Sequence, residues 1–507
     1  MPDSKNLSAC RFTEQCVCNI IITVIKYSQR HHCDLISHSL SLMATQSSLK
    51  ILEVSTISPS SDSPNTATEI SLPLTIFDLF FLKAAPIEVL SFYSHANLDY
   101  FSFDSILSKL KHSLSLTLPH FLPLVGKLTW PPDSQKPIIH YTPGDSISLT
   151  IAESDANFDN LSGDHVTEAR NFCHLIPHLE TSDSKASILT LQVTLFSNKG
   201  FCLGVVANHA VIDGKAMSLF LDSWAYISKL DKDSTLLPEL TPFVDRTAVK
   251  YPATLDSMFS EGLLATNSRS LKPHNFEDPT EDIVRGTFEL SRADIEKLRK
   301  RVFSWGDKVG DEAKTKTVEP FQLSTFVLTF AYIMVCVAKA KELESNKLIC
   351  LYIPANYRSR LDPPVPTNYF GNCAGAGGIV AQARELMEEI GLAIAAYRII
   401  DGIKKVEGFL DEAGKWIKLA TGQMGAEGTQ TLPEIITVAW SNKFKDYERD
   451  FGWGRPQKVA LTNIHRTRAT TIAESKNGNG GVEVGVVLKK HEMDLFASLF
   501  VTGLQSL

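Results

Sequence analysis

The stretch Phe201–Leu230, FCLGVVANHAVIDGKAMSLFLDSWAYISKL, organises the chain around it. Its first part, Phe201–Ala207, is an apolar and β-branched run of strand length. A short polar turn, residues 208–214, follows. Beyond the turn, apolar side chains recur at helical spacing, namely Met217, Phe220, Leu221, Trp224 and Ile227. The pattern predicts a buried strand, a tight turn and an amphipathic helix, which is an α/β unit.

The turn carries two side chains suited to chemistry. His209 stands where the strand ends, and Asp213 stands where the helix begins. Strand ends that face a crevice are where α/β architectures expose reactive groups. A neutral imidazole there can serve as a general base near neutral pH. Two structural interpretations compete: His209 as a hydrogen-bonded structural histidine, and Asp213 as a simple helix N-cap.

The chain lacks the sequence signature of a protein nucleophile. No Gly-x-Ser-x-Gly elbow and no Cys-His signature occurs anywhere in it. If His209 is catalytic, we therefore expect it to act directly on a substrate hydroxyl.

Three motifs in a fixed order point to a family. Residues His209–Gly214 have the form HxxxDG, Asn368–Cys373 read NYFGNC, and Asp450–Gly454 read DFGWG. Together they resemble the plant BAHD acyl-CoA-dependent acyltransferases over residues 43–507. The YFGNC form resembles the branch that acylates anthocyanins and other phenolic glycosides.

The resemblance implies an α/β fold of two similarly sized chloramphenicol-acetyltransferase-like domains, with the active-site channel at their interface. We expect an N-terminal domain over 43–230, a crossover loop over 231–281 and a C-terminal domain over 282–507. Five prolines and many polar residues break the pattern between the two domains. A long structureless segment is uncommon inside one compact domain, so it favours a crossover.

Residues 1–42 differ from the rest of the chain. They contain four of the nine cysteines, but the spacing matches no paired Cys-x-x-Cys metal site. The charges ahead of their apolar run do not suit a signal peptide. We expect a disordered extension or a mis-assigned start codon, with Met43 suiting a true start.

The amino-acid composition and charge limit the classes of partner that the chain is expected to bind. The 507 residues are 44% hydrophobic and 21% charged, and the formal net charge is −7. No basic run favours nucleic acid or a membrane surface, and no apolar stretch reaches the roughly 18 residues that span a bilayer. The five cysteines beyond residue 42 suit free thiols in a reducing compartment. We expect a cytoplasmic protein, and the resemblance implies a monomer.

Two sets of residues are expected to support the site. A buried aspartate needs a cation, and the resemblance implies an arginine partner for Asp213. We choose Arg358 over Arg360 because it lies closer to the end of a predicted strand, so Asp213 orients the turn and carries no proton. The DFGWG segment is expected to be structural; its members are Asp450, Gly452, Trp453 and Gly454.

Four further residues are expected near the substrates. Ser324 and Thr325 open a long apolar helix, which in the resembled family lies along the coenzyme A channel; simple N-capping is the alternative. Trp440 stands where relatives in this branch usually have glycine, and its indole either narrows the acceptor pocket or points into the core. Ser441 is a candidate donor to the oxyanion.

The predicted reaction is direct acyl transfer in a ternary complex, with His209 as general base and an acyl-CoA as co-substrate. Malonyl-CoA is the first donor, hydroxycinnamoyl-CoA the second, and a phenolic or flavonoid glucoside the acceptor. Neither a metal nor a permanently bound cofactor is required. The alternatives are another alcohol or amine acceptor, or a non-catalytic relative that binds acyl-CoA or a phenolic ligand.

Overall fold

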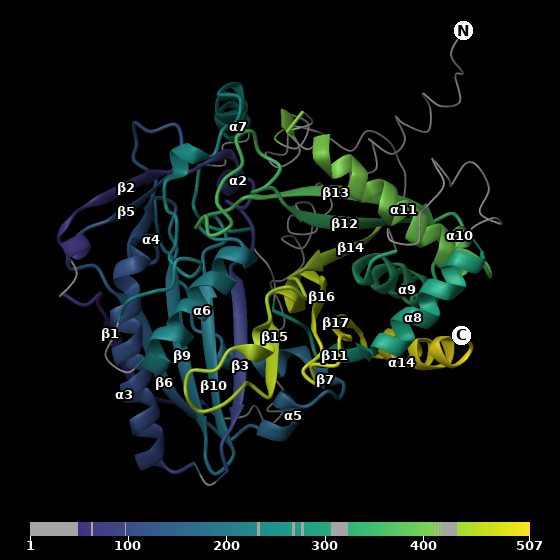
Figure 1. Cartoon of the computed structure of the whole chain (residues 1–507), viewed down its shortest axis with the longest axis horizontal. Coiled ribbons are helices and arrows are strands. Elements are labelled where there is room, and N and C mark those ends of the chain that lie inside the picture. The colour runs from purple at the N-terminus through teal and green to yellow at the C-terminus, as the bar shows by residue number, and fades with distance from the viewer. Residues whose placement is uncertain are drawn as a thin grey trace, which may run out of the picture.

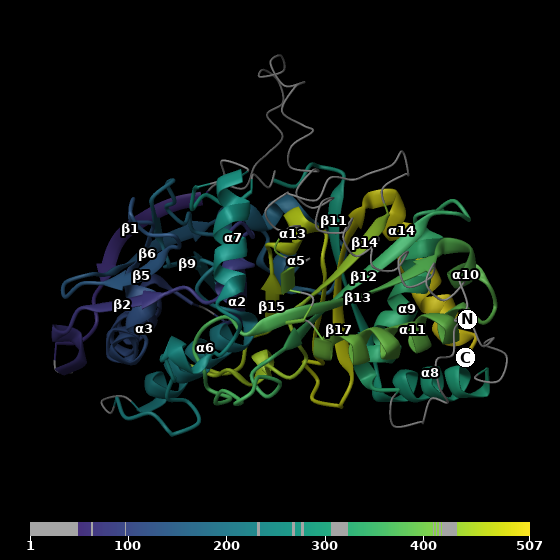
Figure 2. The same ribbon diagram turned by 90° about the horizontal axis from the view of Figure 1, so that it is seen from above.

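The computed structural model describes residues 49–507, apart from 62–63, 97, 231–233, 266–268, 275–277, 306–322, 409, 412, 415–416 and 418–432. The expected N-terminal extension, 1–42, lies outside the described residues. Two sheet-and-helix halves lie side by side (Figures 1 and 2). We call residues 49–230 the N-terminal half and residues 282–507 the C-terminal half.

The N-terminal half is built on a six-stranded sheet in the order β1-β6-β9-β10-β3-β15. Its strands are β1 (Leu49–Ile57), β6 (Ile147–Ser154), β9 (Leu189–Phe196), β10 (Gly200–Ala207), β3 (Ile87–Ser94) and β15 (Lys458–Leu461). Helices α3 (Tyr100–Thr117) and α6 (Gly214–Leu230) lie over one face (Figure 1). The indole N–H of Trp224 on α6 donates to the hydroxyl of Ser113 on α3, at 3.0 Å.

The C-terminal half holds a seven-stranded sheet in the order β13-β12-β14-β16-β17-β11-β7. Its strands are β13 (Ala374–Gln382), β12 (Leu348–Asn356), β14 (Glu434–Ala439), β16 (Thr470–Glu474), β17 (Val482–Lys489), β11 (Ile283–Leu290) and β7 (Thr167–Glu168). Five helices that pack in this half are α8 (Arg292–Ser304), α9 (Thr325–Ala340), α10 (Ala383–Met387), α11 (Gly391–Lys405) and α14 (Lys490–Gln505). A second apolar core, which includes residues of α8, α9, α11 and α14, packs beneath them.

The two halves exchange strands. β15 comes from the C-terminal half of the chain but pairs antiparallel with β3, with Val459 opposite Ser91. In return, β7 from the N-terminal half pairs with β11, with Val284 opposite Glu168. Figure 1 shows β15, in yellow, at the edge of the blue and teal sheet. Each sheet is therefore completed by a strand from the other half.

The remaining elements are short and lie around the two sheets. A four-stranded sheet contains β2 (Ile70–Pro73), β5 (Ile138–Tyr141), β4 (Lys127–Thr129) and β8 (Lys185–Ser187). Among the described residues, further α-helices are α2 (Ile76–Leu79), α4 (Leu122–Val125), α5 (Phe158–Ser162), α7 (Thr254–Ala265) and α13 (Ile464–Thr467). α7 lies within the segment that proline content had predicted to be structureless.

The strand, turn and helix predicted from Phe201–Leu230 are present. Every residue of β10 is buried, and α6 buries its predicted apolar side chains. The glycine-rich run after Cys373 forms β13 and pairs with β12 along nine residues. Glycine has low strand propensity, so pairing with a neighbouring apolar strand decides this conformation.

The described residues contain neither a membrane-spanning helix nor a cluster of metal-ligating side chains. Within them, no helix combines the length and apolarity needed to cross a bilayer. No group of three or more His, Cys, Asp or Glu side chains in the same ranges is placed to hold a metal ion. The five cysteines of these ranges are free thiols, and four of them are buried.

Candidate active site

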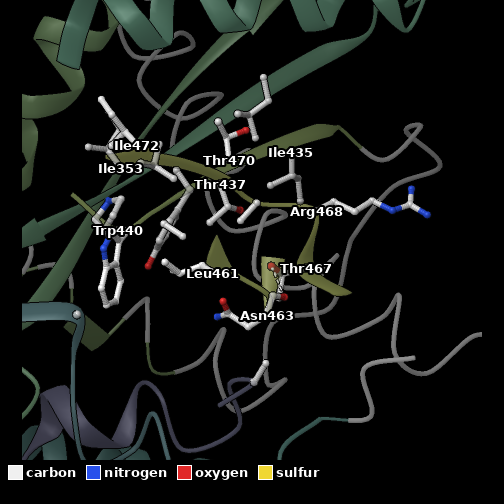
Figure 3. A pocket seen from close by; sticks show the side chains of 18 of the residues that line it. Ile353, Ile435, Thr437, Trp440, Leu461, Asn463, Thr467, Arg468, Thr470 and Ile472 are labelled. Atoms are coloured by element: carbon white, nitrogen blue, oxygen red, sulfur yellow. Dashed lines mark hydrogen bonds between the residues drawn. The ribbon is translucent and has the colours of Figure 1, made fainter. Parts of the chain in front are cut away.

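A cavity of about 1370 Å³ opens between the two halves. Its N-terminal wall comes from the residues around α2 and from the turn after β10, and its C-terminal wall from β12, β14, β16 and β17. Figure 3 shows part of this C-terminal wall, with Trp440 on one side and the Arg468 side chain on the other. Pockets for one small ligand usually enclose about 300–1,000 Å³, so this cavity has room for two substrates.

The turn after β10 places His209 at the cavity wall. β10 ends at Ala207, and the Asn208 side chain accepts a hydrogen bond from the N–H of Ala210, at 3.0 Å. The Asn208 carbonyl accepts from the N–H of Val211, also at 3.0 Å. These bonds make a compact turn in which His209 lines the cavity while its neighbours are buried.

The His209 imidazole is held in an apolar setting. The Phe81 ring stacks on it with centroids 4.1 Å apart and an angle of 5° between the planes. Nδ1 is enclosed and makes no regular hydrogen bond to the described residues. Burial lowers the pKa of His209, although its own backbone carbonyl and Asp213 act in the opposite direction. The uncharged form, which can accept a proton, is therefore favoured.

Asp213 is committed to an ion pair. Its carboxylate accepts two hydrogen bonds from Arg358, at 2.9 and 3.0 Å, and both side chains are almost fully buried. It also accepts from the N–H groups of Ala216 and Cys373. Burial tends to raise the pKa of Asp213, but Arg358 and these donors outweigh burial and hold it below its usual range. Asp213 therefore fixes the turn and is not available to carry a proton.

Arg358 has the geometry expected of the partner to Asp213, and Arg360 does not. Arg358 also donates to the carbonyls of Tyr369 and Gly371, at 2.9 to 3.3 Å. Arg360 is exposed and donates to the carbonyl of Asn356. β12 extends from the C-terminal half toward the N-terminal half (Figure 2), so the residues just after it can reach α6.

A second buried ion pair joins Asp78 on α2 with Arg246 in the crossover segment. Asp78 also accepts from the backbone and side-chain N–H groups of Asn372, at 3.1 and 3.0 Å. Sequence reasoning missed this cluster. The available signals were an aspartate within the apolar run Leu74–Ala84 and the asparagine of YFGNC, while Arg246 stands in a segment with no periodic pattern.

Comparison with known proteins gives this arrangement its context. A model of a family described as the transferase family matches residues 47–501. The chain is 38% identical to phenolic glucoside malonyltransferase 1 of Arabidopsis thaliana, over 91% of this chain and 99% of that protein. It is 36% identical to agmatine coumaroyltransferase of the same organism, over 89% of this chain and 98% of that protein.

The chain belongs to the BAHD acyltransferase family. The crystal structure of vinorine synthase superimposes on it with a TM-score of 0.60 at 20% identity, covering 88% of this chain and 96% of that one. This likeness shows the fold. The expected two-domain chloramphenicol-acetyltransferase-like architecture is confirmed.

In this acyltransferase, Trp440 follows β14 in a left-handed backbone conformation, with φ of 72°. Its indole N–H donates to the buried carboxylate of Asp446, at 2.5 Å, which in turn pairs with Arg449 at 2.9 Å. The indole lies beside Gly214, where an added Cβ would come within 3.3 Å of it. Trp440 thus forms a fixed wall of the cavity next to the HxxxDG turn.

Of the other three residues expected to contact substrates, Ser324 and Ser441 line the cavity and Thr325 does not. Ser324 is the N-cap of α9, accepts from the N–H of Val327 at 3.3 Å, and lines the cavity. Thr325 is the first residue of α9 and is not among the residues that line the cavity. Ser441 lines the cavity, and its hydroxyl accepts from the N–H of Lys443, at 3.2 Å.

The DFGWG motif forms a tight turn. Asp450 accepts hydrogen bonds from the N–H groups of Gly452 and Gly454, at 2.7 and 2.9 Å. Both glycines adopt φ values near +108°, which L side chains rarely adopt (109° and 107°). The motif residues therefore close a local loop and do not line the cavity.

The aromatic residues of this turn pack far from His209. Phe451 stacks on Trp453 with centroids 5.7 Å apart, and Ser228 near the end of α6 donates to the carbonyl of Phe451. α6 starts beside the HxxxDG turn, and at 1.5 Å per residue its far end lies about 20 Å away. The motif thus anchors the far end of the helix that Asp213 begins.

The lowered pKa of His209 predicts an unusual pH profile. Only the uncharged imidazole accepts a proton, so activity is lost as pH falls through the pKa. Because burial places that pKa below the ordinary value of about 6.5, we expect the acidic limb of kcat/KM to have its midpoint below pH 6.5. Steady-state kinetics between pH 4.5 and 8 measure this midpoint, and circular dichroism at each pH checks the fold. A midpoint at or above 6.5 contradicts the prediction.

The two interpretations of Ser324 can be separated by Ser324→Ala. If the hydroxyl acts only as a cap, the free energy of unfolding falls by about 1 kcal/mol and KM for the acyl-CoA is unchanged. If it also contacts the CoA, KM rises, and we expect a rise of about threefold or more, since one neutral hydrogen bond is worth roughly 1 kcal/mol. Ser291→Ala, which removes the comparable cap of α8 away from the cavity, is the matched control.

Proposed function

We propose that this chain transfers an acyl group from acyl-CoA to a hydroxyl of a phenolic or flavonoid glucoside, with malonyl-CoA as the preferred donor. The observation that carries the proposal is the His209 imidazole, whose pKa burial lowers, held at the wall of a cavity large enough for two substrates. The donor and acceptor are supported by the 38% identity to a phenolic glucoside malonyltransferase over nearly the whole chain.

The reaction is a single displacement. His209 accepts the proton of the acceptor hydroxyl while that oxygen attacks the thioester carbonyl carbon. The C–S bond of the resulting tetrahedral intermediate then breaks, and the CoA thiolate takes the proton from the imidazolium. The products are the ester and free CoA. Acyl-CoA is a co-substrate, and the scheme needs no resident cofactor.

The developing oxyanion needs donors. Ser441 is the candidate because its hydroxyl lines the cavity and already accepts a hydrogen bond from Lys443, which leaves its own proton to donate. The ordered turn around His209 and the buried Asp213–Arg358 pair argue against a non-catalytic relative. We also propose that the protein works as a cytoplasmic monomer.

An amine acceptor is the second candidate, supported by the 36% identity to agmatine coumaroyltransferase. An aliphatic amine is protonated near neutral pH, so it must lose a proton before it attacks the thioester. Activity on such an acceptor would continue to rise at pH values above the titration of His209, whereas activity on a glucoside hydroxyl would level off there.

The direct test measures CoA thiol release with the chain expressed from Met43. Malonyl-, acetyl- and coumaroyl-CoA are crossed with flavonoid, anthocyanin and simple phenolic glucosides and with agmatine. We expect turnover with malonyl-CoA and a glucoside, and a loss of roughly 10²-fold or more in His209→Ala, the usual scale for a general base.

His491→Ala, an exposed histidine on α14 outside the cavity, is the matched control and should keep normal turnover. Near-normal turnover in folded His209→Ala overturns the role of the base. Turnover with agmatine alone favours the amine acceptor. Acyl-CoA binding without thiol release from any acceptor favours a binding protein.

Trp440 is proposed to set the acceptor range. Glycine suits the left-handed backbone at this position, and Trp440→Gly removes an indole from the cavity wall. We expect KM for a simple phenolic glucoside to rise about tenfold, because one lost aromatic contact is worth roughly 1.4 kcal/mol. We also expect the rate with bulkier flavonoid glucosides to rise relative to the rate with simple phenolic glucosides. Glu342→Gly, at an exposed left-handed residue outside the cavity, is the control and should leave the acceptor profile unchanged.

A further inference from the structure

We propose that Asp78, Arg246 and Asn372 form a positioning cluster that holds His209 through its backbone and its ring, separately from the Asp213–Arg358 pair. The inference rests on the proposed function, in which His209 is the general base. None of the three residues lines the cavity, so none is expected to touch a substrate.

The cluster holds two carbonyls of the catalytic turn. The Asn372 side-chain N–H donates to the carbonyl of His209 itself, at 2.8 Å. Arg246 donates to the carbonyl of Val211, at 3.2 Å. Buried carbonyls need such partners, and these two lie on either side of Ala210. The turn therefore has its backbone fixed from outside its own helix and strand.

Asp78 holds both donors in place. Its carboxylate pairs with Arg246 and accepts from the backbone and side-chain N–H groups of Asn372. It also accepts from the N–H and hydroxyl of Thr75, both at 2.8 Å, so its acceptor sites are filled. Asp78 is fully buried and Arg246 nearly so. A carboxylate paired in this way keeps its two partners in one geometry.

The same segment fixes the imidazole ring. Phe81 lies three residues beyond Asp78, just after α2, and its ring stacks flat on His209. The anchoring of α2 by Asp78 therefore sets the plane against which the imidazole rests. One carboxylate thus controls the backbone of His209 through Asn372 and its ring through Phe81.

The cluster also connects to the first ion pair through adjacent residues. The N–H of Asn372 donates to Asp78, and the N–H of Cys373 donates to Asp213. The crossover segment is tied to the same strip, because the N–H of Phe370 donates to the carbonyl of Phe243. The catalytic turn is therefore held at two points by consecutive residues of the YFGNC motif.

The first test is Asn372→Ala, which removes the donor to the His209 carbonyl and leaves both ion pairs intact. We expect kcat to fall about tenfold or more, the scale of a small misplacement of a catalytic group, with KM for malonyl-CoA within about twofold. Asn372 also helps to raise the pKa of His209, so the acidic limb of kcat/KM should move to lower pH. Histidine-selective NMR titration, with His209→Ala to assign the ring, should show the same shift.

The second test separates positioning from charge balance. Asp78→Asn alone leaves Arg246 buried without its partner, and we expect Tm to fall. The double variant Asp78→Asn/Arg246→Gln removes both charges, and we expect it to recover Tm while kcat stays about tenfold below the parent. Glu385→Gln/Arg398→Met, which removes a half-buried pair of the C-terminal half away from the cavity, is the control and should keep kcat.

The outcomes are distinct. Unchanged kcat and an unchanged His209 titration in folded Asn372→Ala overturn the proposal, as does a double variant whose kcat recovers together with its Tm. A shifted His209 titration with normal turnover in Asn372→Ala also overturns the positioning role, whereas only normal turnover in folded His209→Ala overturns His209 as the base. Loss of kcat together with the shifted titration supports both.

Discussion

The structure depends on one buried ion pair, Asp213 with Arg358. Burying two charges costs several kcal/mol for each ion unless all their hydrogen-bonding groups are satisfied. Here Asp213 receives four donors, and Arg358 reaches two further carbonyls. The partners lie on opposite halves of the chain, 145 residues apart. The HxxxDG turn therefore has its buried carboxylate paired only when the two halves are docked.

The sequence predicted those parts of the fold and site that depend on residues close together in the chain. The strand, turn and helix around His209 follow from apolar spacing alone. The resemblance implied an arginine partner for Asp213, and the nearby strand end favoured Arg358 over Arg360. The Asp78–Arg246 pair could not be foreseen in this way, because its members are 168 residues apart and one stands in a proline-rich segment. The site residues that were missed are those fixed by tertiary contact.

The same limit applies to the fold. The seven residues Phe201–Ala207 predict a strand from their own apolar pattern. The nine residues of β13 are rich in glycine and form a strand only because β12 lies beside them. Trp440 is a further example. Its left-handed backbone favours glycine, and it is retained where its indole reaches the buried Asp446. Local preference is overridden at these positions by a neighbour distant in sequence, and Trp440 borders the cavity.

The exchanged strand β15 bears on how the chain is made. Strand β3 is the edge of the N-terminal sheet until Lys458–Leu461 pairs with it. A ribosome that adds about 5–20 residues per second needs on the order of tens of seconds to travel from β10 to β15. During that interval the nascent N-terminal sheet presents an unpaired, largely apolar edge, which is a site for intermolecular pairing. That edge is covered only after the C-terminal part of the chain has been made, so the N-terminal sheet cannot be completed during its own synthesis.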